Sequence, residues 1–260
     1  MASAPQSTLP LFYNDLMPLN SRDHAKYRMK GPEGLTWLVN QHAVPLTADE
    51  FIQAQRHYPI VFSSGEGNVP LALMGLNEGV NTFVGEDGKL IEDAYVPAYA
   101  RRYPYLLARL TPDAEELSLC FDPSSGILGE FSDGEPLFDG EGKPDVLVQG
   151  ALDFCQKFEE AGARTQAFIE ELVAKDLLMD GEIAITRNDD PEKPYIYRGF
   201  KMVNEEKLRD LDAETARVWT GNGIMALIFA HLFSMDVMRI IFGRQAAQGK
   251  IPAQVEQPAA

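Results

Sequence analysis

Residues 58–76 read YPIVFSSGEGNVPLALMGL, which is two apolar runs separated by a polar stretch rich in glycine and serine. Short apolar runs bounded by turn residues predict β-strands. Asn81–Val84 and Leu117–Phe121 repeat this pattern, and the Asp87-Gly88 pair between apolar neighbours is typical of a tight hairpin. The sequence from about residue 37 to residue 121 is therefore predicted to be mainly β-structure, arranged like a meander.

Helical signals interrupt this β-rich region twice. Thr47, followed three residues later by Glu50, has the pattern of a capping box at a helix start. Pro97–Tyr103 suits a short helix, because proline is tolerated in a first turn and Pro104 would stop its continuation.

The second half of the chain is predicted to be mainly helical. Apolar residues such as Leu147, Ala151 and Phe154 recur three or four positions apart, which places them on one helix face. We predict a single α+β domain over residues 1–260, with a β-rich N-terminal half packed against a mainly helical C-terminal half. Its sections are flexible tails at 1–20 and 245–260, the β-rich part at 37–121, an acidic Gly/Pro loop region at 122–145, and a mainly helical part with one hairpin at 146–244.

The composition excludes several classes of protein. Hydrophobic residues make up 45% of the 260 residues and charged residues 24%, which is ordinary globular usage and not that of a disordered chain. Lysine and arginine number 23 against 39 aspartate and glutamate, for a net charge of −16. Such a chain lacks the positive field that attracts phosphate backbones, so no nucleic-acid partner is expected.

No export signal or membrane span is predicted. The N-terminal stretch lacks the basic segment and apolar run of a signal peptide. Ile224–Phe242 approaches the length of a membrane span, but it contains His231, Asp236 and Arg239, and ionised groups are costly inside a bilayer. We interpret it as a buried helix of a soluble protein, and the expected location is the cytoplasm.

The common catalytic and cofactor motifs are missing from the sequence. The four histidines lack metal-ligand spacing, and neither a phosphate-binding glycine loop nor a Gly-x-Ser-x-Gly elbow occurs. Cys120 and Cys155 both lie in apolar surroundings, which indicates buried, inert thiols. We predict no metal, no cofactor and no catalytic residue.

The segment Tyr95–Tyr105 and the final helix carry the candidate site. Guanidinium groups beside aromatic rings suit the recognition of a carboxylate, a phosphate or a sugar. The alternative is that the arginines pair with the protein's own acids, for which Asp122 is a candidate. His231 is either a buried, hydrogen-bonded residue that holds its helix against the β half or a titratable group in a cleft. The predicted ligand-binding residues are Tyr95, Tyr99, Arg101, Arg102, Tyr103, Asp122 and His231.

A series of short motifs between about Val44 and Arg239 resembles the bacterial SapC family. The motifs are Val44–Thr47, Tyr58–Phe62, Tyr95–Ala98, Arg101–Tyr105, Leu119–Asp122, Gly129–Glu130, Pro136–Phe138, Gly199–Phe200, Val203–Asn204, Lys207–Leu208, Ala230–Leu232 and Ser234. The family is named after genes of surface-layer systems, and its members occur beside outer-membrane nutrient-uptake receptors and flavin-dependent halogenase-like genes. The same name also labels a peptide-transporter permease, but that protein needs several membrane spans, which this sequence does not offer.

The resemblance implies an accessory role in acquiring a glycan or a peptide, without an agreed activity. Our first hypothesis is a non-catalytic, cytoplasmic protein that binds a protein partner or a small ligand and is linked to surface-layer or nutrient-uptake systems. The second hypothesis is an enzyme of unassigned class in which His231, Arg101 and Asp122 meet in one cleft. The third is a structural subunit of an assembly, such as a homo-oligomer built on the last helix.

Overall fold

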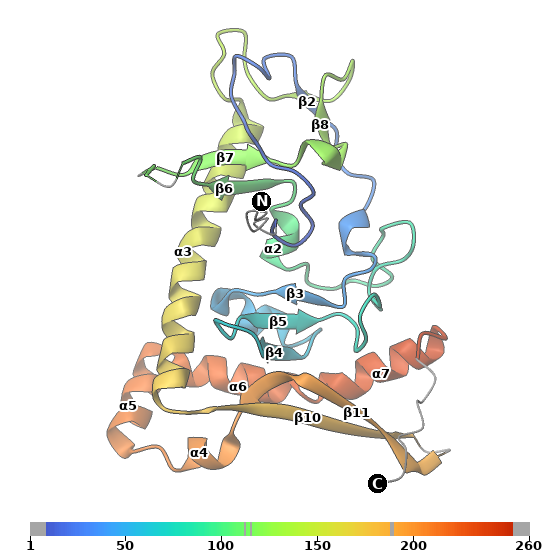
Figure 1. Cartoon of the computed structure of the whole chain (residues 1–260), viewed down its shortest axis with the longest axis vertical. Coiled ribbons are helices and arrows are strands. Elements are labelled where there is room, and N and C mark those ends of the chain that lie inside the picture. Colours follow the sequence, from blue (N-terminus) through green and yellow to red (C-terminus); the bar gives the residue numbers. More distant parts are fainter. Residues whose placement is uncertain (1–8, 112, 115, 188–189, 252–260) are drawn as a thin grey trace, which may run out of the picture. The chain divides into compact units, whose positions relative to one another are not determined.

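The computed structural model describes residues 9–111, 113–114, 116–187 and 190–251 (Figure 1). The chain divides into two compact units, and each is described by itself below. Unit 1 takes its residues from Met1–Gly34 and Ala100–Glu160, and unit 2 takes its residues from Leu35–Tyr99 and Ala161–Ala260. Mixed sheets and helices confirm the predicted α+β class, whereas the single-domain assignment stays a prediction.

Unit 1 contains two small antiparallel sheets. Their strand orders are β1-β7-β6 and β8-β2-β9. Strand β7 occupies the centre of the first sheet, where Cys120 lies opposite Leu106 of β6 and Pro18 of β1. The elements are β1 (Met17–Pro18), β2 (Arg28–Met29), β6 (Tyr105–Ala108), β7 (Ser118–Phe121), the 3-10 helix η3 (Pro123–Ser125), β8 (Leu128–Gly129) and β9 (Glu135–Pro136).

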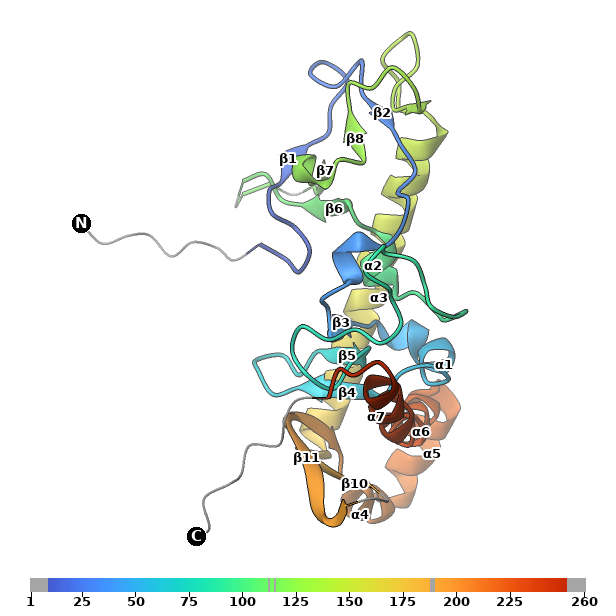
Figure 2. The same cartoon turned by 90° about the vertical axis from the view of Figure 1, so that its right-hand side faces the viewer.

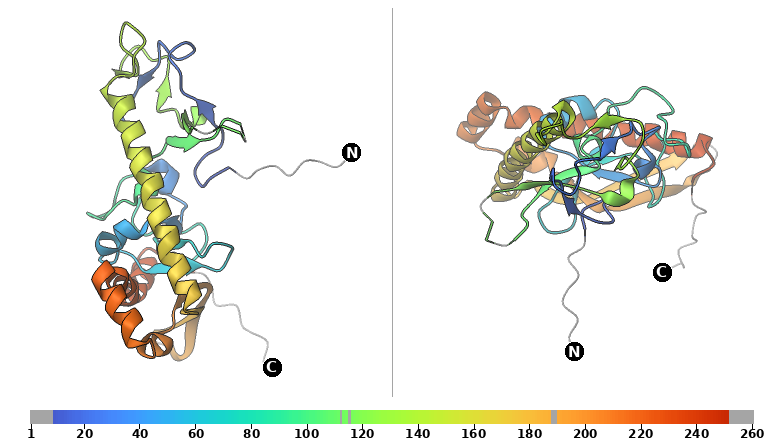
Figure 3. Two further views of the ribbon diagram at one scale, coloured as in Figure 1. Left: turned by 90° about the vertical axis from the view of Figure 1, so that its left-hand side faces the viewer. Right: turned by 90° about the horizontal axis from the view of Figure 1, so that it is seen from above.

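Two helices take residues from both units. Helix α2 is short, at Ala98–Arg101, and lies inside the predicted segment. Helix α3, Val146–Ala174, is one continuous helix (Figure 3). The predicted apolar face is only partly correct near the start of this helix, because Leu147 is 37% exposed and Ala151 and Phe154 are half-buried, whereas the adjacent Val148 and Cys155 are buried. Phe168 and Leu172, further along the helix, are buried as well. Gly162 lies within the uninterrupted helix.

Unit 2 is organised around one five-stranded antiparallel sheet with the strand order β10-β11-β4-β5-β3. Strands of the first half of the chain thus share a sheet with the hairpin of the second half, because Phe200 and Lys201 of β11 pair with Ser63 and Phe62 of β4. The elements are η1 (Thr36–Leu38), β3 (Ala43–Pro45), η2 (Ala48–Glu50), α1 (Phe51–Ala54), β4 (Ile60–Ser63), β5 (Pro70–Leu73), β10 (Leu178–Arg187), β11 (Asp190–Val203), α4 (Glu205–Arg209), α5 (Ala213–Asn222), α6 (Ile224–Ser234) and α7 (Val237–Ala247).

Helix α7 lies beside this sheet (Figure 2), and a buried cluster of side chains joins the two. Val61 of β4, Ile185 of β10 and Phe200 of β11 pack with Met238 and Phe242 of α7. The ring of Phe200 also lies across the facing strand, where a Cβ atom at position 181 would come within 2.1 Å of it. Glycine is therefore required at position 181 for these two strands to pack as they do.

The predicted strand at Asn81–Val84 is wrong, because only a single bridge forms there, between Val84 and Leu90. The side-chain Oδ1 of Asn81 accepts hydrogen bonds from the backbone N–H groups of Phe83 at 2.8 Å and Val84 at 3.1 Å. An asparagine side chain that occupies neighbouring backbone donors favours a turn over a strand ladder. The turn at Asp87-Gly88 does form, with Gly88 at φ 77°.

Helices α6 and α7 follow each other and form the last helical region. Within the described residues, Ile224–Ala247 is the one helical stretch long and apolar enough to cross a membrane by length and composition, and 33% of its most apolar window is buried. Ile228, His231 and Ser234 of α6 are fully buried. The opposite side exposes apolar side chains, with Phe229 stacked on Phe233 at a centroid distance of 5.7 Å.

Candidate functional site

The seven predicted site residues fall in both units. Arg101, Arg102, Tyr103 and Asp122 belong to unit 1. Unit 2 holds Tyr95, Tyr99 and His231. Of the seven, Arg101, Arg102 and Tyr103 line a common pocket within unit 1.

Tyr95 has a structural role in unit 2. Its hydroxyl donates a hydrogen bond of 2.9 Å to Oε1 of Glu50, and its backbone carbonyl accepts one of 2.6 Å from the hydroxyl of Tyr58. Tyr99 follows on α2 and is 8% exposed. The hydrogen bonds of Tyr95 anchor the chain just before Pro97.

Asp122 anchors the N-terminal segment of unit 1. It is fully buried, and its Oδ2 accepts a hydrogen bond of 2.8 Å from the backbone N–H of Asn14. Its Oδ1 accepts from both the backbone N–H and the hydroxyl of Ser124, at 2.8 and 2.7 Å, so that Asp122 caps η3. The hydroxyl of Tyr103 also points to Asp122, at 3.5 Å. Burial and the nearby carboxylate raise the pKa of Tyr103 to about 12.

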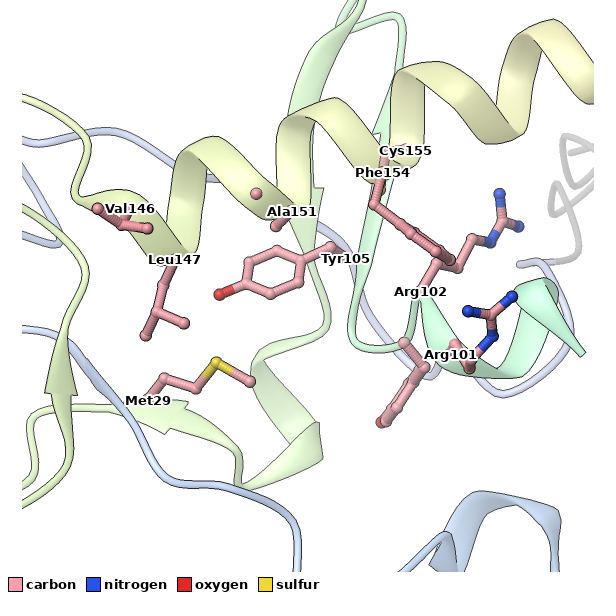
Figure 4. A pocket seen from close by; sticks show the side chains of 11 residues that line it. Met29, Arg101, Arg102, Tyr105, Val146, Leu147, Ala151, Phe154 and Cys155 are labelled. Atoms are coloured by element: carbon pink, nitrogen blue, oxygen red, sulfur yellow. The ribbon is translucent and has the colours of Figure 1, made fainter. Parts of the chain in front are cut away.

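The pocket of unit 1 has a volume of about 300 Å³ (Figure 4). Helix α3 forms one wall, and the segment from Arg101 to Tyr105 forms another. The lining residues are Met29, Arg101, Arg102, Tyr103, Tyr105, Val146, Leu147, Gly150, Ala151, Phe154 and Cys155.

Both arginines stack on aromatic rings of α3. The guanidinium carbon of Arg101, an exposed residue, lies 5.3 Å from the centre of the Phe154 ring. That of Arg102, which is 8% exposed, lies 4.4 Å from the centre of the Phe158 ring. Nη1 of Arg102 lies 3.6 Å from Oε1 of Glu159, which makes an ion pair longer than an ordinary hydrogen bond.

Sequence reasoning missed Tyr105 and Cys155 as parts of the pocket. Tyr105 is 5% exposed, and its hydroxyl has no hydrogen-bond partner among the described residues. Burial raises the pKa of the Cys155 thiol to about 11, so this group is a neutral thiol at physiological pH. The sequence did offer a signal for this wall of the pocket, because Phe154 and Cys155 lie in the segment after residue 146 that was predicted to be helical.

His231 is occupied entirely within unit 2. Its Nε2 accepts a hydrogen bond of 3.1 Å from the backbone N–H of Val203, so the ring proton resides on Nδ1, which donates to the carbonyl of Ile60 at 2.6 Å. Burial lowers the pKa of this histidine to about 4. His231 therefore stays neutral at physiological pH and fastens α6 to β4 and β11.

The residues that the structure describes contain no group of three or more His, Cys, Asp or Glu side chains able to hold a metal ion. The family model SapC matches residues 19–240. The chain belongs to the SapC family. No curated protein and no solved structure matches the chain.

The SapC match spans most of both units. It includes all the residues that line the pocket, from Met29 to Cys155, as well as His231. The pocket and the anchoring histidine therefore both lie in the part of the chain that defines the family.

Proposed function

We propose that this SapC-family chain is a soluble accessory protein that binds a small ligand in the pocket of unit 1 without converting it. One observation carries the proposal. In a chain with a net charge of −16, two guanidinium groups line this pocket, and none of the described residues lining it is acidic. A positively charged recess in an acidic protein favours an anionic ligand.

The chemistry of the pocket supports binding over catalysis. Among the described residues that line it, none is a histidine or a carboxylate, which are the usual general acids and bases. Cys155 is a neutral thiol and therefore a weak nucleophile. The hypothesis of an enzyme with His231 and Asp122 in its centre has little support, because the hydrogen-bonding atoms of both side chains are already occupied.

Family resemblance supports the cellular setting of the proposal. We place the protein in the cytoplasm, linked to a surface-layer or outer-membrane nutrient-uptake system, where it would hold a ligand acquired by that system. The composition favours a protein or small-molecule partner over a nucleic acid.

A structural subunit of an assembly is the second candidate function. It is favoured by the apolar side chains that α6 and α7 expose, Phe229 at 42%, Phe233 at 67% and Ile240 at 55%. The mass of the purified protein in solution separates the two candidates, since a homo-oligomer predicts a multiple of the chain mass and a monomeric binder predicts the chain mass itself.

Replacing Arg101 by alanine should weaken ligand capture and leave the fold intact. The side chain is exposed, so its loss should change the free energy of unfolding by no more than about 0.5 kcal/mol. The protein is purified from its native host and examined by native mass spectrometry. The wild type should carry an adduct of defined mass whose occupancy falls about tenfold in Arg101→Ala, because hydrogen bonds to a charged group are lost.

Arg109 offers a matched control for this experiment. It is an exposed arginine of unit 1 that does not line the pocket, and Arg109→Ala should retain the adduct. Arg102→Ala is a poorer test, because burial of Arg102 between Phe158 and Tyr13 predicts a loss of stability as well. Equal occupancy in wild type, Arg101→Ala and Arg109→Ala would contradict the proposed site.

A further inference from the structure

The hydroxyl of Tyr105 requires an explanation beyond packing. Buried polar groups are nearly always hydrogen-bonded, and a buried hydroxyl without a partner is destabilising. Tyr105 is 5% exposed and its hydroxyl has no partner among the described residues, although phenylalanine would fill the same space without this cost. A ligand that hydrogen-bonds this group in the pocket removes the cost.

Gly150 is a second, independent feature of the same pocket. It lies inside helix α3, where glycine is less favourable than alanine. A Cβ atom at this position would meet no other atom within 4 Å, and its φ is not in the left-handed region. Neither packing nor backbone geometry therefore requires glycine here, and the absence of a side chain at this exposed position keeps the pocket open beside the helix.

The polar groups lie at different ends of the pocket (Figure 4). The hydroxyl of Tyr105 points toward the end where Met29 and Leu147 lie, and the guanidinium groups of Arg101 and Arg102 point away from it. Between them the wall is apolar, with Ala151 and Phe154 from α3.

We infer that the pocket takes an organic carboxylate with an apolar body and a hydrogen-bonding group at the end remote from the carboxylate. The inference rests on the proposed function and specifies its ligand. The carboxylate lies beside the positively charged guanidinium groups at one end, the apolar body lies along α3 beside Gly150, and the remote group hydrogen-bonds the hydroxyl of Tyr105.

Binding of defined compounds tests this ligand class. The probes are ω-hydroxy fatty acids of increasing chain length and para-coumarate, each compared with the parent acid that lacks the hydroxyl and with the methyl ester that lacks the charge. Dissociation constants are measured by calorimetry for the wild type and for Tyr105→Phe, Gly150→Leu and Gly162→Leu. Gly162→Leu is the matched control, because Gly162 lies in the same helix, also has open space at its Cβ position and does not line the pocket.

Each comparison has a definite expected result. The wild type should bind the best hydroxy acid about fivefold more tightly than its parent acid, and this preference should vanish in Tyr105→Phe. The methyl ester should bind at least about tenfold more weakly than the acid. Gly150→Leu should abolish binding by filling the pocket, whereas Gly162→Leu should leave it unchanged.

The outcomes separate the ligand class from the proposed function. If parent acids bind as well as hydroxy acids, or if Tyr105→Phe keeps the preference, the assigned role of Tyr105 is overturned while the pocket remains a binding site. If the methyl esters bind as well as the acids, the inference that the ligand carries a carboxylate is overturned. If no compound of the series binds, the ligand class is wrong, and the native adduct lost in Arg101→Ala decides the proposed function separately.

Discussion

Glu50→Ala is expected to lower the free energy of unfolding of this protein by about 4 kcal/mol, since buried and partly buried donors lose their acceptor. Glu50 is 5% exposed. Its Oε2 accepts hydrogen bonds from the backbone N–H of Thr47 at 2.9 Å and from the Thr47 hydroxyl at 2.8 Å. Its Oε1 accepts from the hydroxyl of Tyr95 at 2.9 Å and from the backbone N–H of Ala98 at 2.6 Å.

The same carboxylate thus joins two segments of unit 2 that are far apart in the chain. It closes the capping box at Thr47 and also holds the start of α2 at Ala98. Alanine would leave the buried donors of Thr47 and the partly buried donors of Tyr95 and Ala98 without this acceptor. An unpaired buried donor costs more than a hydrogen bond contributes on average. The variant should also show faster hydrogen exchange around Tyr95, because the tie to that segment is gone.

The neighbouring carboxylate provides a control. Asp49 is largely exposed and forms an ion pair with Arg164 at 2.6 Å. Exposed ion pairs contribute little, so Asp49→Ala should cost less than about 1 kcal/mol. Urea unfolding measures the free energy of unfolding of both variants. If Asp49→Ala and Glu50→Ala lose similar amounts of stability, Glu50 is not the anchor described above.

His231→Leu is expected to cost about 3 kcal/mol, because it leaves the N–H of Val203 and the carbonyl of Ile60 without partners. Ser234, one turn further along α6, accepts a hydrogen bond of 2.8 Å from the backbone N–H of Ile60. The two side chains therefore hold both backbone groups of Ile60, and loss of His231 should loosen α6 from β4 as well.

The stability should also depend on pH through His231. Its pKa is about 4 in the folded protein against 6.5 for an unperturbed histidine. Between these values the unfolded chain binds a proton that the folded chain does not, so stability falls as the pH is lowered from 6.5 to 4. Over this pH window, protonation linked to His231 should lower the free energy of unfolding by about 3 kcal/mol.

Comparing the wild type with His231→Leu separates the contribution of His231 to the pH dependence of stability from that of the carboxylates. Urea unfolding of the wild type and of His231→Leu is measured at neutral pH and at the acidic end of the window. The wild type should lose about 3 kcal/mol more than the variant, which has no imidazole to protonate. An equal pH dependence of the two proteins would mean that His231 is not buried and neutral as described.

Local patterns were enough to predict many elements of this fold. The apolar runs became β4, β5 and β7, and Thr47 with Glu50 forms a capping box at the helix start that the sequence predicts. Such patterns succeed because periodicity, turn chemistry and capping depend on residues only a few positions apart. The prediction of a strand at Asn81–Val84 was wrong because the side chain of Asn81 accepts hydrogen bonds from backbone N–H groups that a strand would have used.

The segment Tyr95–Tyr105 could be proposed as a candidate ligand site from the sequence, but the partners of its residues could not be predicted. The amino-acid sequence by itself determined that adjacent guanidinium groups and tyrosines occur together in a strongly acidic chain. Only the tertiary structure decided that Tyr105, Gly150 and Cys155 line the same pocket. It also decided that the side chains of Asp122 and His231 form hydrogen bonds with backbone groups of the protein itself. The physical reason is that contacts between residues distant in the chain depend on which surfaces are buried together, and no local pattern encodes that choice.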